Sequence, residues 1–332
     1  MNTVSLPHIQ ANNTALNLQW NVATAIPVDG YRMIYMGCAE VSATLCSAIQ
    51  PMEDKKIRPG APRRVLRLAV LSFLLRIGRI TKFSPSWRGV ESLTELYRRI
   101  IPEDLLLRIK DIDGDLTFDV NLRGNMGLYL WHYPELFEKE EREMFCLSIT
   151  PGCTVLDVGA NIGFYTLLAA KRGARVFSIE ADPLNAAMLR HHVEINGFSK
   201  QVTIYHMAAT DSVKKVPLYR HPFNLGESNI LENGQICEMI EGATLDSLNL
   251  PSIDICKMDI EGAELLALRG MQDTLARSPG IKLFVEHADL FKNSQALLAY
   301  LRKNFSRLQI MEAPGADPHG NIPSHCNILA LR

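Results

Sequence analysis

The sequence of 332 residues contains no Cys-x-x-Cys pair and no cysteine–histidine cluster with the spacing of a zinc site. Its seven cysteines are scattered and odd in number, a pattern that favours buried thiols in a reducing compartment over a disulfide framework. The N-terminus lacks the basic region followed by an apolar region that marks a secretory signal peptide. We therefore expect a cytoplasmic protein.

An excess of charge is also absent, because 35 basic residues balance 36 acidic ones and the formal net charge is -1 at pH 7. The charge of the whole molecule therefore does not attract it to nucleic acid or to a membrane. The hydrophobic fraction of 47% is high enough, at this length, for the core of one large or two ordinary domains.

One segment departs from this balance. Residues 55–99 contain twelve lysines and arginines against two glutamates, and they enclose the apolar sequence VLRLAVLSFLLRIGRI at Val65–Ile80. Its uninterrupted apolar run is too short for a transmembrane helix, which needs about 20 residues. Two interpretations stay open: a helix that packs on the catalytic domain or on a second subunit, and a basic amphipathic helix within residues 60–82 that lies on an anionic membrane surface. Because the segment lacks interleaved aromatic residues, we expect no nucleic-acid partner.

The chain divides into three predicted regions. Residues 1–60 show no sustained period, and we expect little fixed structure there apart from a short strand around Tyr31–Tyr35. Residues 61–128 are predicted to form an entry module that joins the basic helical segment to a β-hairpin at Arg108–Asp119, with Asp113-Gly114 as its tight turn. Residues 129–332 are predicted to form the catalytic domain.

The catalytic domain is predicted to begin with a helix from about Pro134. Its wet side is expected to carry the charged run Glu138, Lys139, Glu140, Glu141 and Arg142, and its dry side Leu136, Phe137, Met144 and Phe145.

From Thr154 onward, short apolar runs mostly alternate with helical stretches. The predicted strands are Thr154–Val158, Arg175–Ile179, Val202–His206, Ile255–Met258 and Lys282–Val285. The predicted helices are Ile162–Lys171, Pro183–Asn196, Ala263–Leu275 and Ser294–Asn304. This alternation is typical of an α/β fold with a doubly wound parallel sheet. The last two runs, Leu308–Met311 and Asn327–Leu331, have no crossover helix between them and must be antiparallel, so the sequence predicts a mainly parallel sheet that ends in an antiparallel pair.

The loop after the first of these strands reads VLDVGANIGFY, with Gly159 and Gly163 four residues apart. It matches neither the dinucleotide pattern G-x-G-x-x-G nor a P-loop, because Asn161 stands where the second glycine belongs and no lysine follows. Asp157 would repel a pyrophosphate but attract a cation, such as the sulfonium and ammonium of S-adenosylmethionine. Glu180, at the end of the second strand, can accept hydrogen bonds from both ribose hydroxyls, which suits either NAD or S-adenosylmethionine.

Several motifs together resemble one family. VLDVGANIGFYTLLAA, VFSIEADPLNAAMLRHHVEING, AATD, ATLDSL, ICKMDIEGAELLALRGMQDTL and LFVEH, in this order and spacing, are similar to the FkbM family of S-adenosylmethionine-dependent methyltransferases. The resemblance covers roughly Tyr129 to Glu312 and leaves out the first hundred residues. Met258 stands where the family often has an aliphatic residue, a change without chemical effect.

The resemblance implies a class I methyltransferase fold, Rossmann-like with a seven-stranded sheet, and methyl transfer to a hydroxyl oxygen of a sugar, polyketide or similar acceptor. The donor-binding residues that it implies are Asp157, Gly159, Asn161 and Gly163 for the methionine end, Glu180 for the ribose, and Ala208 and Ala209 beside the adenine with Asp211 nearby.

A hydroxyl acceptor loses its proton as its oxygen attacks, so the site needs a proton acceptor at the carboxyl ends of the fourth and fifth strands. Asp259 is the first candidate for positioning the acceptor or tuning the sulfonium surroundings, with a helix N-cap as its alternative role. Glu261 is the second, with compensation of the helix dipole as its alternative. His287 titrates in a suitable range but could be a hydrogen-bonded structural residue. Lys257 alternates with Asp259 on the strand, which suggests an ion pair.

Hard oxygen ligands for Mg²⁺ could come from Asp259, Glu261 and Asp289, but no tight spacing requires a metal and we predict none. The insert between Thr210 and Thr244 is longer than a simple connection. It suits either a plain surface hairpin or a lid over a polyhydroxylated acceptor, with Arg220, His221, Asn224 and Ser228 as its polar side chains.

The sequence therefore predicts an S-adenosylmethionine-dependent O-methyltransferase of small molecules or glycans, cytoplasmic and in peripheral contact with a membrane if residues 60–82 bind one. Two other hypotheses stay open. An NAD-linked oxidoreductase is disfavoured by Asn161 and Asp157, and a non-catalytic, membrane-associated scaffold is disfavoured by the intact set of Asp157, Glu180 and Asp259.

Overall fold

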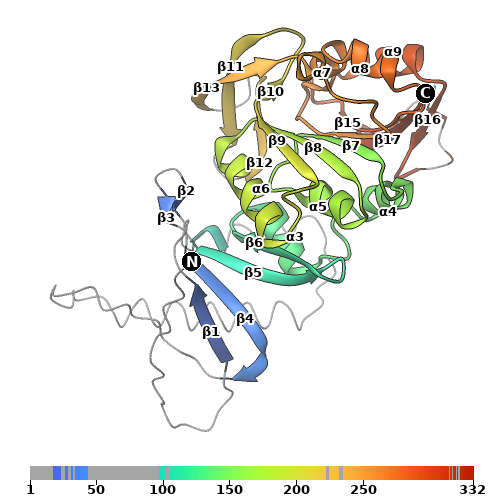
Figure 1. Cartoon of the computed structure of the whole chain (residues 1–332). Coiled ribbons are helices and arrows are strands. Elements are labelled where there is room, and N and C mark those ends of the chain that lie inside the picture. Colours follow the sequence, from blue (N-terminus) through green and yellow to red (C-terminus); the bar gives the residue numbers. More distant parts are fainter. Residues whose placement is uncertain are drawn as a thin grey trace. The chain divides into compact units, whose positions relative to one another are not determined.

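The structure is a computed structural model of the whole chain, and it describes residues 18–23, 27–28, 31–32, 34–43, 97–99, 101, 105–221, 224–231, 235–313, 315, 317–318, 320 and 322–332. The chain forms two compact units, Met1–Pro134 and Glu135–Arg332 (Figure 1). The sequence-based boundary lies between Leu128 and Tyr129, just before this division. The basic helix predicted within residues 60–82 lies outside the described residues and stays a prediction. Among the described helices, none is long and apolar enough to span a membrane.

The first unit contains a four-stranded sheet in the order β1-β4-β5-β6. Its strands are β1 (Leu18–Ala23), β4 (Ile34–Ala43), β5 (Leu105–Ile112) and β6 (Leu116–Val120), and a separate pair joins β2 (Pro27–Val28) to β3 (Tyr31–Arg32). Strands β4 and β5 run parallel, whereas β5 and β6 form the predicted antiparallel hairpin. Among the described residues of the region 1–60, four strands are present, where the sequence led us to expect a single short one around Tyr31–Tyr35.

The turn of that hairpin has the predicted chemistry. Asp113 and Gly114 adopt φ values of 50° and 95°, the left-handed conformation that an Asp-Gly pair tolerates. Helix α3 (Asn125–His132) follows, and the hydroxyl of Tyr97 lies 3.0 Å from Nε2 of His132 within the same unit.

The second unit is built on a seven-stranded sheet in the order β16-β17-β15-β14-β7-β8-β9. The strands are β7 (Thr154–Val158), β8 (Arg175–Glu180), β9 (Val202–His206), β14 (Ile255–Met258), β15 (Lys282–Ala288), β16 (Arg307–Ile310) and β17 (His325–Leu331). Only β17 runs antiparallel to its neighbours β15 and β16. The predicted mainly parallel sheet with an antiparallel last strand is confirmed. The first strand of this unit, β7, lies in the middle of the sheet, and the chain order reverses between β7 and β14.

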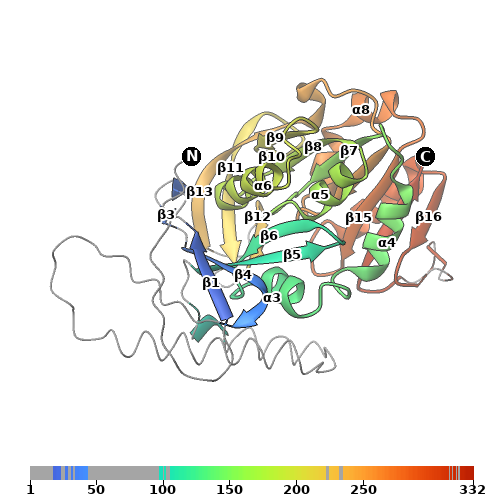
Figure 2. The same ribbon diagram turned by 60° about the horizontal axis from the view of Figure 1, so that its bottom comes forward.

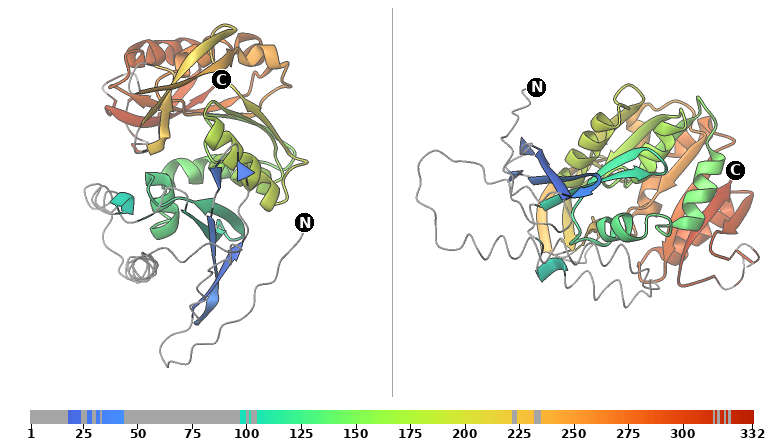
Figure 3. Two further views of the ribbon diagram at one scale, coloured as in Figure 1. Left: turned by 90° about the vertical axis from the view of Figure 1, so that its left-hand side faces the viewer. Right: turned by 90° about the horizontal axis from the view of Figure 1, so that it is seen from below.

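Helices cover both faces of this sheet. They are α4 (Lys139–Ser148), α5 (Phe164–Lys171), α6 (Pro183–Ile195), α7 (Glu264–Arg269), α8 (Gln272–Arg277) and α9 (Ser294–Asn304). Helices α5 and α6 lie on one face, and α7, α8 and α9 on the other (Figures 1 and 3). This arrangement is the reason why the central strands are mostly apolar and almost completely buried, since both of their faces are covered.

The helix predicted as one piece over Ala263–Leu275 is interrupted after Arg269. A Cβ atom on Gly270 would lie 2.1 Å from the backbone oxygen of Thr210, so the chain at Gly270 passes directly against another segment. This close approach leaves two short helices in place of one.

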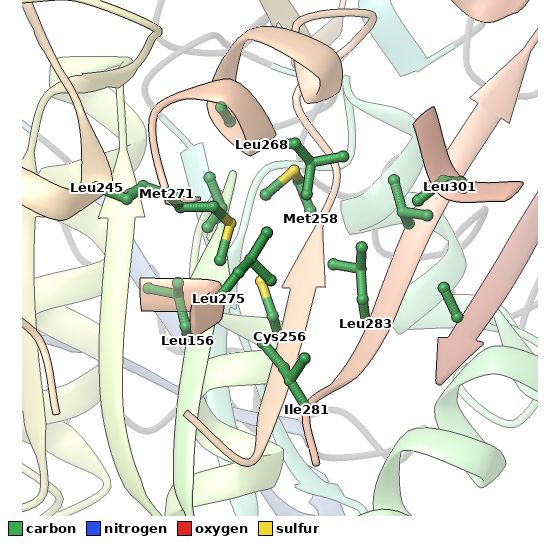
Figure 4. Packing of buried hydrophobic residues seen from close by; sticks show 14 of the residues in the cluster. Leu156, Leu245, Cys256, Met258, Leu268, Met271, Leu275, Ile281, Leu283 and Leu301 are labelled. Carbon is green, nitrogen blue, oxygen red and sulfur yellow. The ribbon is translucent and has the colours of Figure 1, made fainter. Parts of the chain in front are cut away.

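The core on the α7–α9 side joins strand and helix residues from the whole unit (Figure 4). Leu156, Met258 and Leu283 project from three neighbouring strands, and Leu268 and Leu275 meet them from α7 and α8. All five are at most 3% exposed, which fixes the carboxyl ends of these strands in place.

The insert between Thr210 and Thr244 forms most of a second sheet, in the order β10-β13-β11-β12 (Figure 2). Its strands are β10 (Ala208–Ala209), β11 (Lys214–His221), β12 (Asn224–Asn229) and β13 (Gln235–Ala243), and a 3-10 turn follows at Leu245–Leu248. Strand β13 pairs in parallel with β10, which directly follows β9 in the chain. The insert is therefore attached to the segment after β9 and is more than a free hairpin.

Candidate active site

The candidate site lies at the carboxyl ends of β7, β8 and β14. In an open α/β sheet, ligands bind beyond these ends at the point where the strand order reverses. Here that point lies between β7 and β14, which pair from Ile255 with Val155 to Met258 with Val158.

The glycine loop after β7 is fitted closely to the neighbouring strands. Gly159 has a φ of 83° and donates its N–H to the oxygen of Ile179 at 2.9 Å. A Cβ on Gly159 would lie 1.8 Å from the backbone oxygen of Asp259, so no other residue fits there without a shift. Gly163 has a φ of 98°, and a Cβ there would lie 2.5 Å from Cδ1 of Leu189 on α6.

Asn161 occupies the left-handed region with a φ of 50°, which asparagine tolerates better than most residues. Its side-chain oxygen accepts the N–H of Ile162 at 2.8 Å, and its own N–H donates to Oε2 of Glu180 at 2.7 Å. The other oxygen of Glu180 accepts the N–H of Asp182, also at 2.7 Å. Glu180 therefore joins the loop after β7 to the loop after β8.

Two carboxyl groups next to the glycine loop, those of Glu180 on β8 and Asp157 on β7, are buried. Burial raises the pKa of Glu180 to about 7, although its two backbone hydrogen bonds act in the opposite direction. Burial likewise raises the pKa of Asp157, which is 1% exposed, to about 6. Asp157 accepts the hydroxyl of Thr166 at 2.6 Å, and that hydroxyl also lies 2.7 Å from Ser178.

The structure therefore brings five of the predicted donor-binding residues together at one edge: Asp157, Gly159, Asn161, Gly163 and Glu180. Ala208 and Ala209 follow closely, because the N–H of Met207 donates to the oxygen of Glu180 at 3.0 Å. Both alanines are buried in β10. Asp211 instead faces Lys214, whose ammonium lies 3.0 Å away and holds the pKa of Asp211 below its ordinary value.

Lys257 is the centre of a buried ionic network. It is 1% exposed, and its Nζ lies 3.2 Å from Oδ2 of Asp259 and 3.3 Å from Oε1 of Glu141 on α4. The same ammonium lies 5.2 Å from the centre of the Tyr165 ring, within the range of a cation–π contact. The expected ion pair between Lys257 and Asp259 is present.

The network shifts the pKa of its members in opposite directions. Burial alone would lower the pKa of Lys257, but the surrounding carboxylates outweigh it and hold that pKa well above the ordinary value. Burial raises the pKa of Asp259, yet the Lys257 ammonium reverses this and leaves it below the ordinary value. Asp259 is therefore ionised near neutral pH, and its side chain is 33% exposed.

Glu141 and its neighbour Glu138 were not recognised from the sequence as site residues, and the prediction that Glu141 lies on the wet side of its helix is wrong. Glu141 is 2% exposed. Burial raises its pKa to about 8, in spite of the nearby Lys257 ammonium, and burial also raises the pKa of Glu138. Glu141 and Phe145 are four residues apart and so share a helix face, and this spacing was the signal that pointed to burial.

Asp259 does not cap a helix. The N-cap residue of α7 is Ala263, and the preceding turn is closed by Glu264, whose Oε1 accepts the N–H groups of Ile260 at 3.0 Å and Gly262 at 3.1 Å. The alternative structural role for Asp259 is therefore excluded, and its carboxylate is available to the site.

Three carboxylates gather beside Lys257. One oxygen from each of Asp259, Glu261 and Glu286 lies within 4.8 Å of the others, and Glu286 is paired with Nε2 of His325 at 2.6 Å. Hard divalent cations accept such oxygen sets. Lys257 already supplies positive charge to Asp259, and we assign no metal here. Glu261 is thus brought to the site, at a φ of 55° in the turn before α7.

His287 is not brought to this group. Neighbouring residues of a strand point to opposite faces, so His287 projects away from Glu286. It is fully buried, and its Nε2 lies 3.3 Å from Asp289. Burial lowers its pKa below the ordinary value. This position does not support His287 as the proton acceptor, nor Asp289 as a partner of Asp259 and Glu261.

Two of the four polar residues predicted for the insert, Arg220 and Ser228, contact Asp182 at the start of α6. Arg220 on β11 contacts both carboxylate oxygens of Asp182 and also Oε1 of Glu238, and Ser228 donates to Asp182 at 3.2 Å. Asp182 is itself fully buried and caps α6 by accepting the N–H of Leu184. The side chains of His221 and Asn224 lie outside the described part of the structure.

An inner strand β7, a glycine loop after it, a carboxylate at the end of the next strand and an antiparallel β17 define the fold of the class I methyltransferases. The family model of the methyltransferase FkbM domain matches residues 157–308. This match confirms the resemblance drawn from the motifs over that part of the chain, and it favours a methyltransferase over the NAD-linked oxidoreductase.

Curated relatives match shorter stretches. A ribosomal protein L11 methyltransferase of Desulfitobacterium hafniense is 26% identical over 130 residues, 39% of this chain and 34% of the relative. An arginine N(omega)-methyltransferase of Streptomyces achromogenes subsp. streptozoticus is 31% identical over 113 residues, 32% of this chain and 31% of the relative. The chain thus spans about a third of the length of these relatives. A solved FkbM methyltransferase from Methylobacillus flagellatus KT is 19% identical, with a TM-score of 0.39, over 73% of this chain and 59% of that one.

Proposed function

We propose that the protein is an S-adenosylmethionine-dependent O-methyltransferase that acts on a hydroxyl group of a sugar, glycan or natural-product acceptor. The observation that carries the proposal is the position of Asp259. Its backbone lies against Gly159 of the glycine loop, while its ionised and partly exposed carboxylate is held by Lys257. A carboxylate beside the donor loop can orient an acceptor hydroxyl and take its proton.

The residues at this edge fit the donor. Gly159 and Gly163 have the left-handed φ values that let the loop turn tightly against Asp259 and Leu189, and the methionine end would lie on this loop. Asp157, just before the loop, supplies negative charge for the cationic donor. Both oxygens of Glu180 accept one backbone N–H each, which leaves each oxygen a further lone pair for a ribose hydroxyl. S-adenosylmethionine, when bound, supplies an electrophilic methyl group. The protein's contribution is to orient the acceptor, exclude water and hold the released proton.

A second candidate acceptor is a guanidinium group. The cluster of Asp259, Glu261 and Glu286 favours it, because three carboxylates within 4.8 Å suit a planar cation with several N–H donors. The similarity to an arginine methyltransferase, limited to 113 residues, is consistent with this choice. A hydroxyl acceptor remains the first proposal, since Asp259 can bind a hydroxyl without any partner charge.

The Asp259→Asn variant tests the proposal. We expect S-adenosylhomocysteine to raise the melting temperature of the wild type and of the variant alike, whereas NAD has no effect. Methyl transfer to panels of sugars, polyols and arginine-containing peptides would be followed by intact mass. We expect transfer to a hydroxyl compound, reduced about 100-fold or more in the variant, as is typical when a positioned proton acceptor is removed. The control is Asp289→Asn, which changes a half-exposed carboxylate outside the cluster.

Transfer only to arginine would select the guanidinium acceptor in place of the hydroxyl. Full turnover in Asp259→Asn would remove Asp259 from the mechanism. If NAD raised the melting temperature and S-adenosylhomocysteine did not, the proposal that S-adenosylmethionine is the donor would be wrong.

A further inference from the structure

The carboxyl groups around Lys257 outnumber the positive charges that could neutralise them. Glu141 and Asp259 lie at nearly equal distances from its Nζ, 3.3 Å and 3.2 Å, so one ammonium is shared between two carboxyl groups. Lys257 and Glu141 are both almost fully buried, and Glu141 lies on α4, before the first residue of the family match.

Further ionisable groups face the network from the elements around it. They are Glu138 before α4, Asp157 on β7, Tyr165 on α5, Glu261 in the turn before α7, Glu286 on β15 and His325 on β17. None of the first five adds positive charge, and His325 is paired with Glu286. Because buried carboxylates in excess of the available cations do not all ionise, at least one of them holds a proton.

Glu141 is the group that the surroundings select. It is only 2% exposed and its Oε1 lies 3.3 Å from the shared ammonium, whereas Glu138 is partly exposed. Asp157 accepts the hydroxyl of Thr166, and Glu286 is paired with His325. Asp259, in contrast, is 33% exposed, and water can stabilise its charge. Burial raises the pKa of Glu141 to about 8, which agrees with a neutral carboxylic acid at pH 7.

We propose that Glu141 is a proton-holding positioning residue of the methyltransferase site: it is neutral when no donor is bound and ionises when the cationic donor binds. The ionised Glu141 then draws the Lys257 ammonium toward itself and leaves Asp259 a stronger acceptor for a proton. The inference rests on the proposed function, because it requires the donor to bind at the loop of Gly159.

Two residues, Asp259 and Lys257, connect the glycine loop to Glu141. Gly159 touches the backbone of Asp259, Asp259 contacts Lys257, and Lys257 contacts Glu141. A positive charge placed at the loop favours the ionised form of every carboxyl group near it. S-adenosylhomocysteine has nearly the same shape but lacks the sulfonium charge, so it should not release the proton of Glu141.

Calorimetry with the full chain tests this difference without an acceptor. Binding of S-adenosylmethionine and of S-adenosylhomocysteine would be measured at pH 7 in two buffers of different ionisation enthalpy, which gives the number of protons released. In the wild type we expect more protons released with S-adenosylmethionine, with a difference of up to one per site. We expect this difference to disappear in Glu141→Gln and to persist in the control Glu143→Gln, an exposed residue of the same helix.

A second measurement covers the case in which Glu141→Gln does not fold. Infrared difference spectra of the wild type, unlabelled and with ¹³C-labelled glutamate, should show a protonated glutamate band that is lost with S-adenosylmethionine and kept with S-adenosylhomocysteine. Equal proton release for the two ligands in the wild type, or an unchanged difference in Glu141→Gln, would overturn the inference. If neither ligand bound, the proposed function would fail as well, so the two failures are distinguishable.

Discussion

In the glycine loop after β7, Gly159 is the position with the least space for a side chain. Replacing it with alanine combines a left-handed φ of 83° with a Cβ at 1.8 Å from the oxygen of Asp259. We expect Gly159→Ala to lose binding of S-adenosylhomocysteine in calorimetry and to lower the free energy of unfolding by about 3 kcal/mol, a sum of backbone strain and displacement of Asp259.

The matched control is Gly152→Ala. Gly152 has almost the same φ, 84°, but a Cβ there would meet nothing within 4 Å. It should cost only about 1 kcal/mol, the strain of the left-handed backbone. Equal losses in the two variants would contradict the steric role assigned to Gly159.

The position of the glycine loop at the end of β7 could be predicted from the sequence, because its residues are contiguous and follow a short apolar strand. Glu141 was missed because its partner Lys257 is far away in the chain and because it stands in a run of charged residues, which suggested exposure although its spacing from Phe145 indicated a buried face. His287 shows the reverse case. Its residue type suited a proton acceptor, but strand alternation turns it away from Glu286 and into the core.

At the scale of single elements, the ion pair between Arg220 of β11 and the buried Asp182 joins the second sheet to the start of α6. Arg220→Ala would leave the fully buried Asp182 without its arginine partner and free β11 from the start of α6. We expect a loss of about 3 kcal/mol in the free energy of unfolding, because an uncompensated buried carboxylate remains. Limited proteolysis should cut the variant within the insert faster than the wild type.

Lys215→Ala on the same strand provides the control. Lys215 pairs with Glu241 at 3.2 Å, but both side chains are about two-thirds exposed. Such surface pairs contribute roughly 0–1 kcal/mol, so this variant should resemble the wild type. If both variants behaved alike, Arg220 would not anchor the insert.

Most elements of the second unit were predictable because parallel strands and their helices repeat a pattern of period and length. Strands β7, β9 and β14 and helix α9 have the predicted bounds. The break after Arg269 was not predictable, since it depends on the approach of Thr210 from another part of the chain. The sheet formed by the insert was missed for a similar reason, because β10 and β13 pair across the whole of β11 and β12.

At the scale of the whole molecule, several buried carboxyl groups have a raised pKa: about 6 for Asp157, about 7 for Glu180 and Glu264, and about 8 for Glu141. The folded state therefore binds more protons than the unfolded state between about pH 4.5 and pH 8, and stability falls as pH rises through this range. Urea unfolding should give a free energy that is lower at pH 8.5 than at pH 5.5 by on the order of a few kcal/mol.

Glu141→Gln should reduce this difference, because the substitution removes one of the groups that must lose a proton on the alkaline side. A stability that stays level or increases from pH 5.5 to pH 8.5 would show that these carboxyl groups are not protonated in the folded protein.

The location of Glu141 also determines how the catalytic unit should be isolated. A fragment cut at the start of the family match, residue 157, would begin inside β7 and omit α4. It would lose three residues of the central strand and leave the Lys257 ammonium without the Glu141 carboxyl group. A fragment that begins at Glu135 keeps both, so cloning and directed-evolution libraries of this unit should start there.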